Sequence, residues 1–435
     1  MSKESSLKAS FWDGVFASAM LGLTANYTTP FALVLGATNF HIGLLNSIPL
    51  LLSSLVQLWS TEIGKKAGSR VKFITQAVFL QAAAFIGICL IFLIPKHFQI
   101  KTFIVLVAMI GIFGSVSTPV WAALMSDTVD KNQYGRYFAW RGKVLGFVGL
   151  VSSFSAGFFL FIYPNKLVGF IILFVLAGLC RVISGIWLGR MDDIPLVYSP
   201  EKQFSYRQFI KRFAESNFVR FVFFVALINF ATFLAAPFFA VYMLEELGFK
   251  YSTYTIVNTA GALAGLISLP FWGKLADRYG NARIIKSSAK FLPLLPIFWL
   301  FSKNPIHLAM VNAIAGYVWA GFNLSVINFI FDISSREART RCVAYFNVTN
   351  GIFIFLGAFI GGYLATHLSG MFFGSALLTL FFISGIARFL VSIFIAGKFR
   401  EVREVEKIKD KEMLYIVLGI TTALSLGEGI YRRKS

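Results

Sequence analysis

The chain has 435 residues, of which 57% are hydrophobic and 14% are charged, and its mean hydropathy is +0.73. Water-soluble domains usually carry about 25% charged residues, so this composition excludes an ordinary soluble fold. A helix needs roughly 20 mostly apolar residues to cross a bilayer, and lipid offers no partners to unpaired backbone groups. Because the apolar runs are too long for barrel strands, we expect an all-α integral membrane protein.

The net charge of +20 comes from 40 basic and 20 acidic residues. With the helices placed as below, the lysines that fall in outward loops are Lys96, Lys101, Lys166, Lys250 and Lys303. The remaining basic residues lie mostly near the inward side, as the positive-inside rule expects. Attraction to anionic membrane lipid therefore accounts for the excess charge, and we expect no nucleic-acid partner.

The apolar runs divide into two sets of six. The first set is expected at about 11–36, 42–62, 72–94, 101–126, 142–163 and 167–189, after a polar tail at 1–10. The second set is expected at about 219–245, 252–272, 284–302, 307–331, 342–366 and 371–397. The sequence thus predicts an N-terminal bundle at 1–190, a cytosolic linker at 191–218, a C-terminal bundle at 219–400 and a cytosolic tail at 401–435.

Two segments outside the bundles are distinctive. Within the linker, residues 204–213 place aromatic side chains on one face and basic ones on the other, which is typical of an amphipathic helix on the inner leaflet. In the tail, the apolar core at 414–426 is too short to span. We expect this core to be interfacial or partly disordered.

The second half repeats the first. Landmarks recur at an offset of 205 to 207 residues, in the pairs Pro30 and Pro237, Asp127 and Asp332, Arg136 and Arg341, Gly146 and Gly351, and Arg181 and Arg388. Six helices per copy is an even number, so both copies enter the membrane from the same side. The sequence therefore predicts twelve transmembrane helices in two six-helix bundles, related by a pseudo-two-fold axis normal to the membrane.

One polar stretch, Gly273 to Arg283, separates two apolar runs and is expected to form a tight inward loop. Its pattern, Gly-x-Leu-Ala-Asp-Arg-x-Gly-x-x-Arg, resembles the loop signature of the major facilitator superfamily, whose members are twelve-helix secondary transporters. The first-half copy, Gly64 to Arg70, has Gly68 in place of the acid.

The resemblance implies a gating role for this stretch. In the superfamily such loops latch the two halves in the outward-facing state. By resemblance the latch residues are Gly273, Asp277, Arg278 and Gly280, with a related inward network of Asp127, Arg136, Asp332 and Arg341. Simple anchoring of the topology remains the alternative for the arginines.

A solute site is expected near the midplane, where the two bundles face each other. Neutral polar residues at that depth are the informative ones, and the candidates are Asn26, Tyr27, Asn229, Trp319, Asn323 and Asn350. The alternative is that these amides join helices to one another. For Arg181 and Arg388 we favour a structural role, by snorkelling or by pairing with a neighbouring helix, over an anion site.

These observations predict a secondary active transporter for a small solute, acting by alternating access in the cytoplasmic membrane. Both termini are expected in the cytosol, and the protein is expected to be a monomer in contact with membrane lipid. The sequence does not reveal a coupling ion such as H⁺, because no Asp or Glu lies in the middle of an expected helix. Asp13, at the start of the first helix, comes nearest.

Other functions stay open at this point. The alternatives are a proton-coupled multidrug efflux carrier and a transporter-shaped receptor or sensor. An enzyme is not expected, because no nucleophile with a base is visible, and the three cysteines show no metal-ligand spacing. We likewise expect no cofactor.

Overall fold

The computed structural model describes residues 3–66, 68–130, 134–163, 165–194, 206–211, 215–334, 339–368, 370, 374–406 and 408–417. Regular structure in these ranges is helical. The first half contains α1 (Lys3–Thr24), α2 (Thr28–Val34), α3 (Asn39–Lys66), α4 (Arg70–Cys89), η1 (Ile91–Leu93), α5 (Lys96–Thr128), α6 (Tyr134–Ile162) and α7 (Lys166–Leu188), followed by α8 (Tyr206–Lys211).

The second half has the same plan. It contains α9 (Asn217–Phe233), α10 (Phe238–Val241), the π-helix η3 (Tyr242–Glu246), α11 (Tyr251–Tyr279), α12 (Asn281–Phe291), α13 (Leu294–Phe298), α14 (Pro305–Ile333), α15 (Arg339–His367), α16 (Ala376–Phe394) and η4 (Ala396–Lys398). The last helix, α17 (Asp410–Val417), follows the twelve membrane segments.

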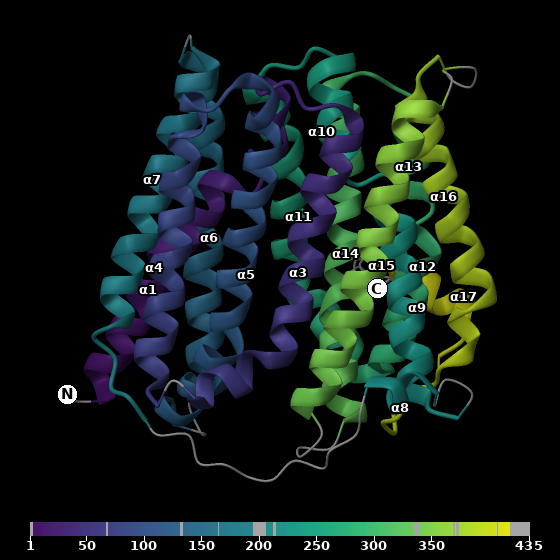
Figure 1. Cartoon of the computed structure of the whole chain (residues 1–435). Coiled ribbons are helices and arrows are strands. Elements are labelled where there is room, and N and C mark those ends of the chain that lie inside the picture. Colours follow the sequence, from purple (N-terminus) through teal and green to yellow (C-terminus); the bar gives the residue numbers. More distant parts are fainter. Residues whose placement is uncertain are drawn as a thin grey trace, which may run out of the picture.

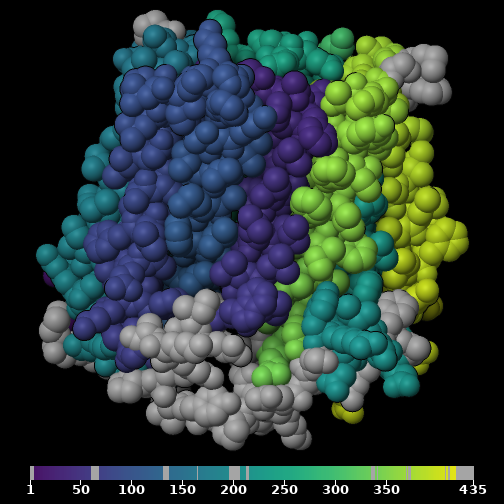
Figure 2. All heavy atoms as spheres, in the orientation of Figure 1, coloured from purple at the N-terminus to yellow at the C-terminus, as the bar shows by residue number. Residues whose placement is uncertain are grey.

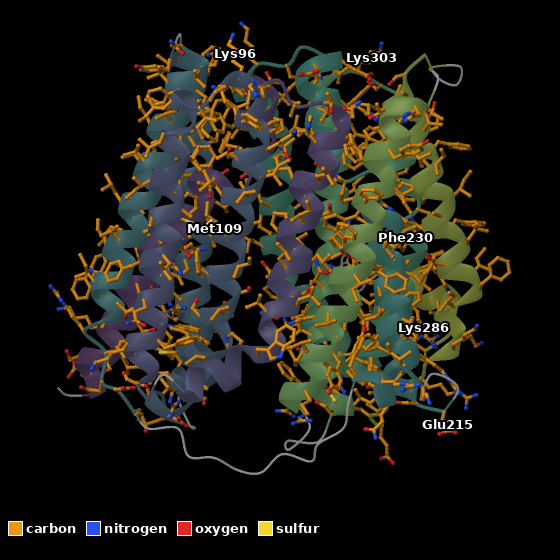
Figure 3. All side chains as sticks on the ribbon, viewed as in Figure 1. Lys96, Met109, Glu215, Phe230, Lys286 and Lys303 are labelled. Carbon is orange, nitrogen blue, oxygen red and sulfur yellow. The ribbon has the colours of Figure 1, made fainter. Side chains whose placement is uncertain are left out.

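The two halves stand side by side across one seam (Figure 1). At this seam α3 packs against α15 and α6 packs against α11. The surface view shows α3 and α15 in contact along the front of the molecule (Figure 2). Lys96 and Lys303 lie at one end of the helices, and Lys286 lies toward the other end, as the predicted topology requires (Figure 3). The twelve-helix, two-bundle fold is thus confirmed.

Ten described helical segments are long and apolar enough to cross a membrane. The first and ninth predicted segments are not among these ten, and both are divided, into α1 and α2 and into α12 and α13. The seventh is also interrupted, between α9 and α10. The breaks in the first and seventh segments precede Pro30 and Pro237, one of the repeat pairs.

The ninth segment shows how such breaks are stabilised. Pro293 and Pro296 lack the N–H groups that would bond the carbonyls of Ala289 and Leu292 in a continuous helix. The Ser392 hydroxyl donates to Ala289 O at 2.8 Å, and Arg388 Nη1 donates to Leu292 O at 3.1 Å. Arg388 therefore holds two helices together, which is the structural role that the sequence favoured.

Its counterpart Arg181 belongs to a buried network in the first half. Arg181 Nε donates to Gln81 Oε1 at 2.6 Å and Nη1 donates to Ser184 Oγ at 2.9 Å. The Ser184 hydroxyl in turn donates to Asp13 Oδ1 at 2.7 Å. Arg141 approaches the same carboxylate at 3.8 Å. The network links α1, α4, α6 and α7, so buried charges are compensated within one bundle.

Two expectations about local structure were wrong. Helix α1 begins at Lys3, so residues 3–10 are helical rather than a polar tail. Helix α11 continues to Tyr279 and α12 begins at Asn281, so the expected loop is reduced to Gly280, whose φ of 88° suits glycine. The expected amphipathic segment contains a helix, α8, and Phe209 on it is buried against Tyr345 of α15. Its place at the inner leaflet stays a prediction.

The C-terminal tail also differs from expectation in its described part. Residues 399–406 run under the second half, and α17 packs against its flank, with Met413 fully buried. Residues 418–426 of the predicted apolar core lie outside the described residues.

Close packing joins α11 to α14. A Cβ added to Gly316 would lie 1.9 Å from the carbonyl oxygen of Gly261. We therefore expect Gly316→Ala to lower thermal stability, because overpacking of this kind costs about 1–3 kcal/mol. Gly273→Ala on α11 is the control, since no neighbouring atom lies within 4 Å of its Cβ position. Thermal unfolding in detergent measures both, and equal melting temperatures would contradict the tight contact.

Candidate functional site

The break in the first membrane segment places a backbone acceptor at the seam. Pro30 has no N–H to donate to the carbonyl of Asn26, four residues earlier. The hydroxyl of Tyr254, on α11 of the opposite half, donates to this carbonyl at 2.7 Å. The Asn26 carbonyl, which has no helical donor in the first half, therefore accepts its hydrogen bond from the second half.

Tyr27, in the same turn, makes a second bond across the seam. Its hydroxyl donates to Ser153 O at 2.6 Å and lies 2.8 Å from Thr255 Oγ1. The rings of Tyr27 and Tyr254 meet edge to face, with centroids 6.5 Å apart. We refer to Tyr27, Tyr254 and these bonds as the tyrosine latch.

Other contacts close the outer part of the seam. Asn39 Nδ2 donates to Ala365 O at 3.2 Å, and α2 packs against α10. Between described residues, the seam hydrogen bond nearest the inner side joins Asn347 Nδ2 to Gln57 Oε1 at 2.8 Å. The two halves are therefore joined from the outer ends of α3 and α15 to beyond their centres.

A polar cavity of about 210 Å³ lies beside the latch, between the two halves. It is lined by Ala25, Asn26, Thr29, Asn46, Ala236, Pro237, Phe239, Ala240, Met243, Tyr254, Asn258 and Asn312. These residues come from the broken first and seventh segments and from α3, α11 and α14. All of the lining side chains are uncharged.

Four asparagines, which we call the asparagine cage, supply most of the polar lining: Asn26, Asn46, Asn258 and Asn312. The amide nitrogens of the first three donate within the protein, to Ser153 Oγ, Thr29 Oγ1 and Tyr254 O respectively. Their amide oxygens have no hydrogen-bond partner among the described residues. The cage therefore offers free acceptors, together with both amide atoms of Asn312.

The predicted solute-site residues are not all brought together. Asn26 lines the cavity, whereas Tyr27 is fully buried in the latch. Asn229 Nδ2 donates to Asn350 Oδ1 at 2.8 Å, which joins α9 to α15 within the second half.

Two further candidates lie on α14, farther toward the inner side. Asn323 is exposed and lies roughly 16 Å along the helix from Asn312. Trp319 packs edge to face on Phe322, with ring centroids 5.4 Å apart. Neither residue lines the cavity.

The sequence candidates omitted Asn46, Asn258 and Asn312. A usable signal existed: these residues lie at the depth of the two proline breaks. An interrupted membrane helix is a pointer to a binding site. The sequence does not show which asparagines on different helices lie at the same depth in the membrane.

The inward network is divided between the halves. Asp127 pairs with Arg70 at 2.8 Å within the first half. The side chain of Arg136 lies outside the described residues. In the second half Asp332 accepts from Asn281 Nδ2 at 2.7 Å and pairs with Arg403 at 3.2 Å. The ion pairs between described residues each lie within one half.

The remaining predicted gating residues lie at the inner ends of α11 and α15. Arg278 pairs with Glu406 at 2.7 Å. Asp277 is exposed, with no hydrogen-bond partner among the described residues. Gly273 has open space at its Cβ position. Arg341 lies beside Tyr345.

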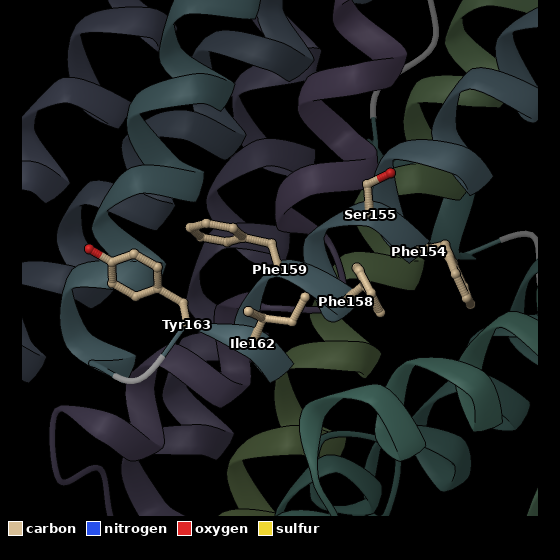
Figure 4. Close-up of a pocket in the computed structure, with 6 residues that line it drawn as sticks. All are labelled: Phe154, Ser155, Phe158, Phe159, Ile162 and Tyr163. Carbon is tan, nitrogen blue, oxygen red and sulfur yellow. The ribbon is translucent and has the colours of Figure 1, made fainter.

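A second hollow, of about 310 Å³, is formed at one end of α6 (Figure 4). Its lining is Phe154, Ser155, Phe158, Phe159, Ile162 and Tyr163. Phe154, Phe158 and Ile162 are each at least half exposed. An apolar surface on one membrane helix suits lipid, so we do not assign a solute to it.

Comparison with known proteins identifies the family. The model of the Major Facilitator Superfamily matches residues 14–239 and 221–428. The chain belongs to this superfamily. It is therefore a secondary transporter and a multi-pass membrane protein.

Several curated relatives are efflux proteins. Multidrug resistance protein MdtG of Escherichia coli is 24% identical over 71% of this chain and 74% of its own length. Quinolone resistance protein NorA of Staphylococcus aureus is 30% identical over 37% of this chain and 40% of its own length. A multi-drug resistance efflux pump PmrA homolog of Lactococcus lactis matches over 28% of its length. The latter two matches thus span well under half of each relative.

Solved structures share the fold. A D-xylose–proton symporter has a TM-score of 0.70 at 12% identity, covering 93% of this chain and 99% of the symporter. A bacterial homologue of the iron transporter ferroportin, in an inward-facing state, has a TM-score of 0.67 at 12% identity, covering 90% of this chain and all of the homologue. At such identities the likeness establishes the architecture alone.

The latch generates a test. Tyr254→Phe keeps the ring but leaves the Asn26 carbonyl without its donor, at a cost of about 1–3 kcal/mol in the closed outer seam. We expect a cysteine at Ala240, in a protein whose native cysteines are serines, to react about tenfold faster or more with an external impermeant thiol reagent.

The matched control for this test is Tyr251→Phe. The Tyr251 hydroxyl has no hydrogen-bond partner among the described residues. The control should label at the parental rate. Equal labelling of both variants would mean that the Tyr254 hydroxyl does not hold the seam closed.

Proposed function

We propose that this transporter moves a small, uncharged, hydroxyl-rich solute by alternating access, and that the solute binds in the asparagine cage. The carrying observation is the set of amide oxygens without partners at the cavity. Acceptors at the wall of a cavity favour a ligand that brings O–H or N–H donors, because those donors would otherwise lose their hydrogen bonds to water on binding.

The size of the cavity supports a small solute. Pockets for drug-sized ligands are usually about 300–1,000 Å³, whereas this cavity is about 210 Å³. Phe239 and Met243 supply apolar wall on one side, and the cage supplies polar wall on the other. A compact ring with several hydroxyl groups fits this division.

Alternating access then consists of rocking one half against the other around the cage. The tyrosine latch holds the outer side, and its bonds must break for the outer side to open. On the inner side, Asp277 is exposed when the outer side is closed. We propose that it accepts a partner when the inner ends meet, together with Trp319 and Asn323 lining the inward path.

Multidrug efflux with proton coupling is the second candidate, favoured by the names of the curated relatives. Many such drugs are cationic or large and aromatic. The cavity lining has no carboxylate to attract a cation. Its composition and size therefore favour the neutral solute.

The membrane, the oligomeric state and the topology are also proposals. We place the protein in the cytoplasmic membrane as a monomer, with both termini in the cytosol. Its domains are those expected from the sequence, at 1–190, 191–218 and 219–400, followed by a C-terminal segment at 401–435 whose described part packs against the second half. We propose that it moves its solute without covalent chemistry.

Solute flux tests the function directly. Proteoliposomes containing the purified protein are loaded with sugars, polyols or nucleosides in one set and with cationic dyes in another. Accelerated passage of a neutral hydroxylated compound supports the proposal. Passage of dyes alone would replace it with efflux, and no accelerated passage under any ion gradient would count against transport.

The cage makes a sharper prediction. Asn312→Ala removes an amide that has no hydrogen-bond partner in the described protein, so folding should be unaffected. Loss of one solute hydrogen bond, about 0.5–1.5 kcal/mol, should weaken affinity roughly two- to tenfold. Asn323→Ala, on the same helix, should change affinity less. Ligand-induced thermal stabilisation measures both, and equal effects would displace the site from the cage.

For Asp277, at the inner side, we predict an effect on the transport rate and none on solute affinity. Asp277→Asn should slow transport several-fold and leave solute affinity unchanged, because Asp277 is remote from the cage and acts on the balance of states. Glu404→Asn, another exposed acid at the inner side, is the control. Flux and binding measured on the same preparations decide the matter. A parallel loss of affinity would argue for a role in the site itself.

A further inference from the structure

The chain beyond the last membrane helix folds back onto the inner end of the second half. Phe399 is fully buried and packs against Phe221, Phe224 and Phe329. Asn217 Nδ2 donates to Arg400 O, and Arg400 N donates to Asn217 Oδ1, both at 2.8 Å. The segment is therefore anchored where α9 begins.

Glu401 then caps the next helix. Its carboxylate accepts from Ala282 N at 2.8 Å, at the start of α12, where the helix dipole favours an anion. The first half has the same device: Asp193, after α7, accepts from Arg70 N and Val71 N at 3.1 and 3.3 Å. Because both copies carry this cap, we attribute it to the fold.

Beyond Glu401, the chain contacts two charged residues that were predicted to act in gating, Asp332 and Arg278. Arg403 pairs with Asp332 at 3.2 Å and donates to Ala276 O at 2.7 Å. Glu406 pairs with Arg278 at 2.7 Å, and its backbone N–H donates to Arg278 O. The exposed pair is weak by itself, but the contacts together join α11 to the end of α14.

Helix α17 continues this attachment up the flank of the bundle. Met413 and Val417 are buried in a cluster with Trp272, Leu275 and Ile284. The Tyr317 hydroxyl donates to Val417 O at 2.9 Å, and Tyr317 lies near the middle of the 29-residue α14. The described tail thus reaches well into the depth of the membrane segments, beside α11, α12 and α14.

We propose that residues 399–406 and 408–417 form a conformational clamp that favours the state with the outer side closed. Arg278 and Asp332 are paired with the clamp, so they are not available to the first half. The clamp also fixes the inner ends of α11, α12 and α14 relative to one another. Closing the inner side requires these ends to meet the first half, so release of the clamp favours the opposite state. The inference rests on the proposed alternating access.

The coupling is reciprocal by thermodynamic necessity. If the clamp stabilises the closed outer side, then holding the outer side closed must stabilise the clamp. The effect of the clamp on the outer seam and the effect of the outer seam on the clamp can be measured separately, in different variants of this protein. Each measurement reports on the states of the molecule whatever its solute, so failure of the substrate assignment does not affect them.

The first measurement uses a disulfide across the outer seam. Asn39→Cys and Ala365→Cys are combined with serine at the three native cysteines, because Asn39 Nδ2 lies 3.2 Å from Ala365 O. The clamp variant Arg403→Gln/Glu406→Gln is compared with Arg400→Gln/Glu404→Gln. The control side chains lie in the same segment, are exposed and make no hydrogen bond or ion pair with described residues. Both double variants remove one charge of each sign.

We expect cross-linking of the clamp variant to be several-fold slower than that of the parent, and cross-linking of the control to equal that of the parent. A clamp variant that cross-links at the parental rate overturns the proposal. So does a variant with a lower melting temperature and unchanged cross-linking, because this result would assign the segment to stability alone.

The second measurement needs no clamp variant and therefore does not depend on its folding. Hydrogen exchange is followed at the amides of Ala282, Arg403 and Glu406, with the outer disulfide formed and with it reduced. These amides donate to Glu401, Glu401 and Arg278 respectively. Slower exchange in the oxidised protein is expected. Identical exchange in the two forms would refute the clamp.

Discussion

A carbonyl without a donor is the constraint on which much of this structure depends. Lipid supplies no hydrogen bonds, so each proline inside a membrane helix leaves an acceptor that the protein itself must satisfy. In the ninth segment the donors are Ser392 and Arg388, both from the neighbouring α16. At Pro30 the donor is Tyr254, from the other half of the molecule. The bonds from α16 join two helices of the same bundle. The bond from Tyr254 joins the two bundles, so the break at Pro30 contributes to the contact between the halves.

The same break accounts for the position of the proposed solute site. Interrupting a helix exposes backbone and separates neighbouring side chains, which leaves room for a cavity of about 210 Å³ next to Asn26. The bond that closes the outer seam and the wall of the cavity therefore share two residues, Asn26 and Tyr254. A solute that contacts Asn26 or Tyr254 is placed to influence the seam directly, to the extent that it binds the closed and open arrangements with different affinity.

The sequence predicted the architecture well, whereas the cavity at the seam is lined by only one of the six predicted solute-site residues, Asn26. Hydropathy, charge asymmetry and the pairs such as Pro30 and Pro237 are properties of single segments, so twelve helices in two related halves could be inferred. The cage combines amides from separate helices, and its depth depends on where each helix breaks. Asn323 was a reasonable candidate by position on its own helix, yet α14 carries it inward of the cavity. The tail was misjudged because its burial depends on a groove formed by α11, α12 and α14.

The two halves are alike in their helices and unlike at their inner ends. Both cap their third helix with an acid that follows their sixth, Asp193 in one and Glu401 in the other. In the first half Gly68 stands where the signature acid would be, and the signature of the second half keeps Asp277. The second half alone continues, in the described chain, into a segment that pairs with Arg278 and Asp332. Duplication supplied two equivalent inner surfaces. In the proposed mechanism, the missing acid of one copy and the attached tail of the other place control of the inner side with the second half.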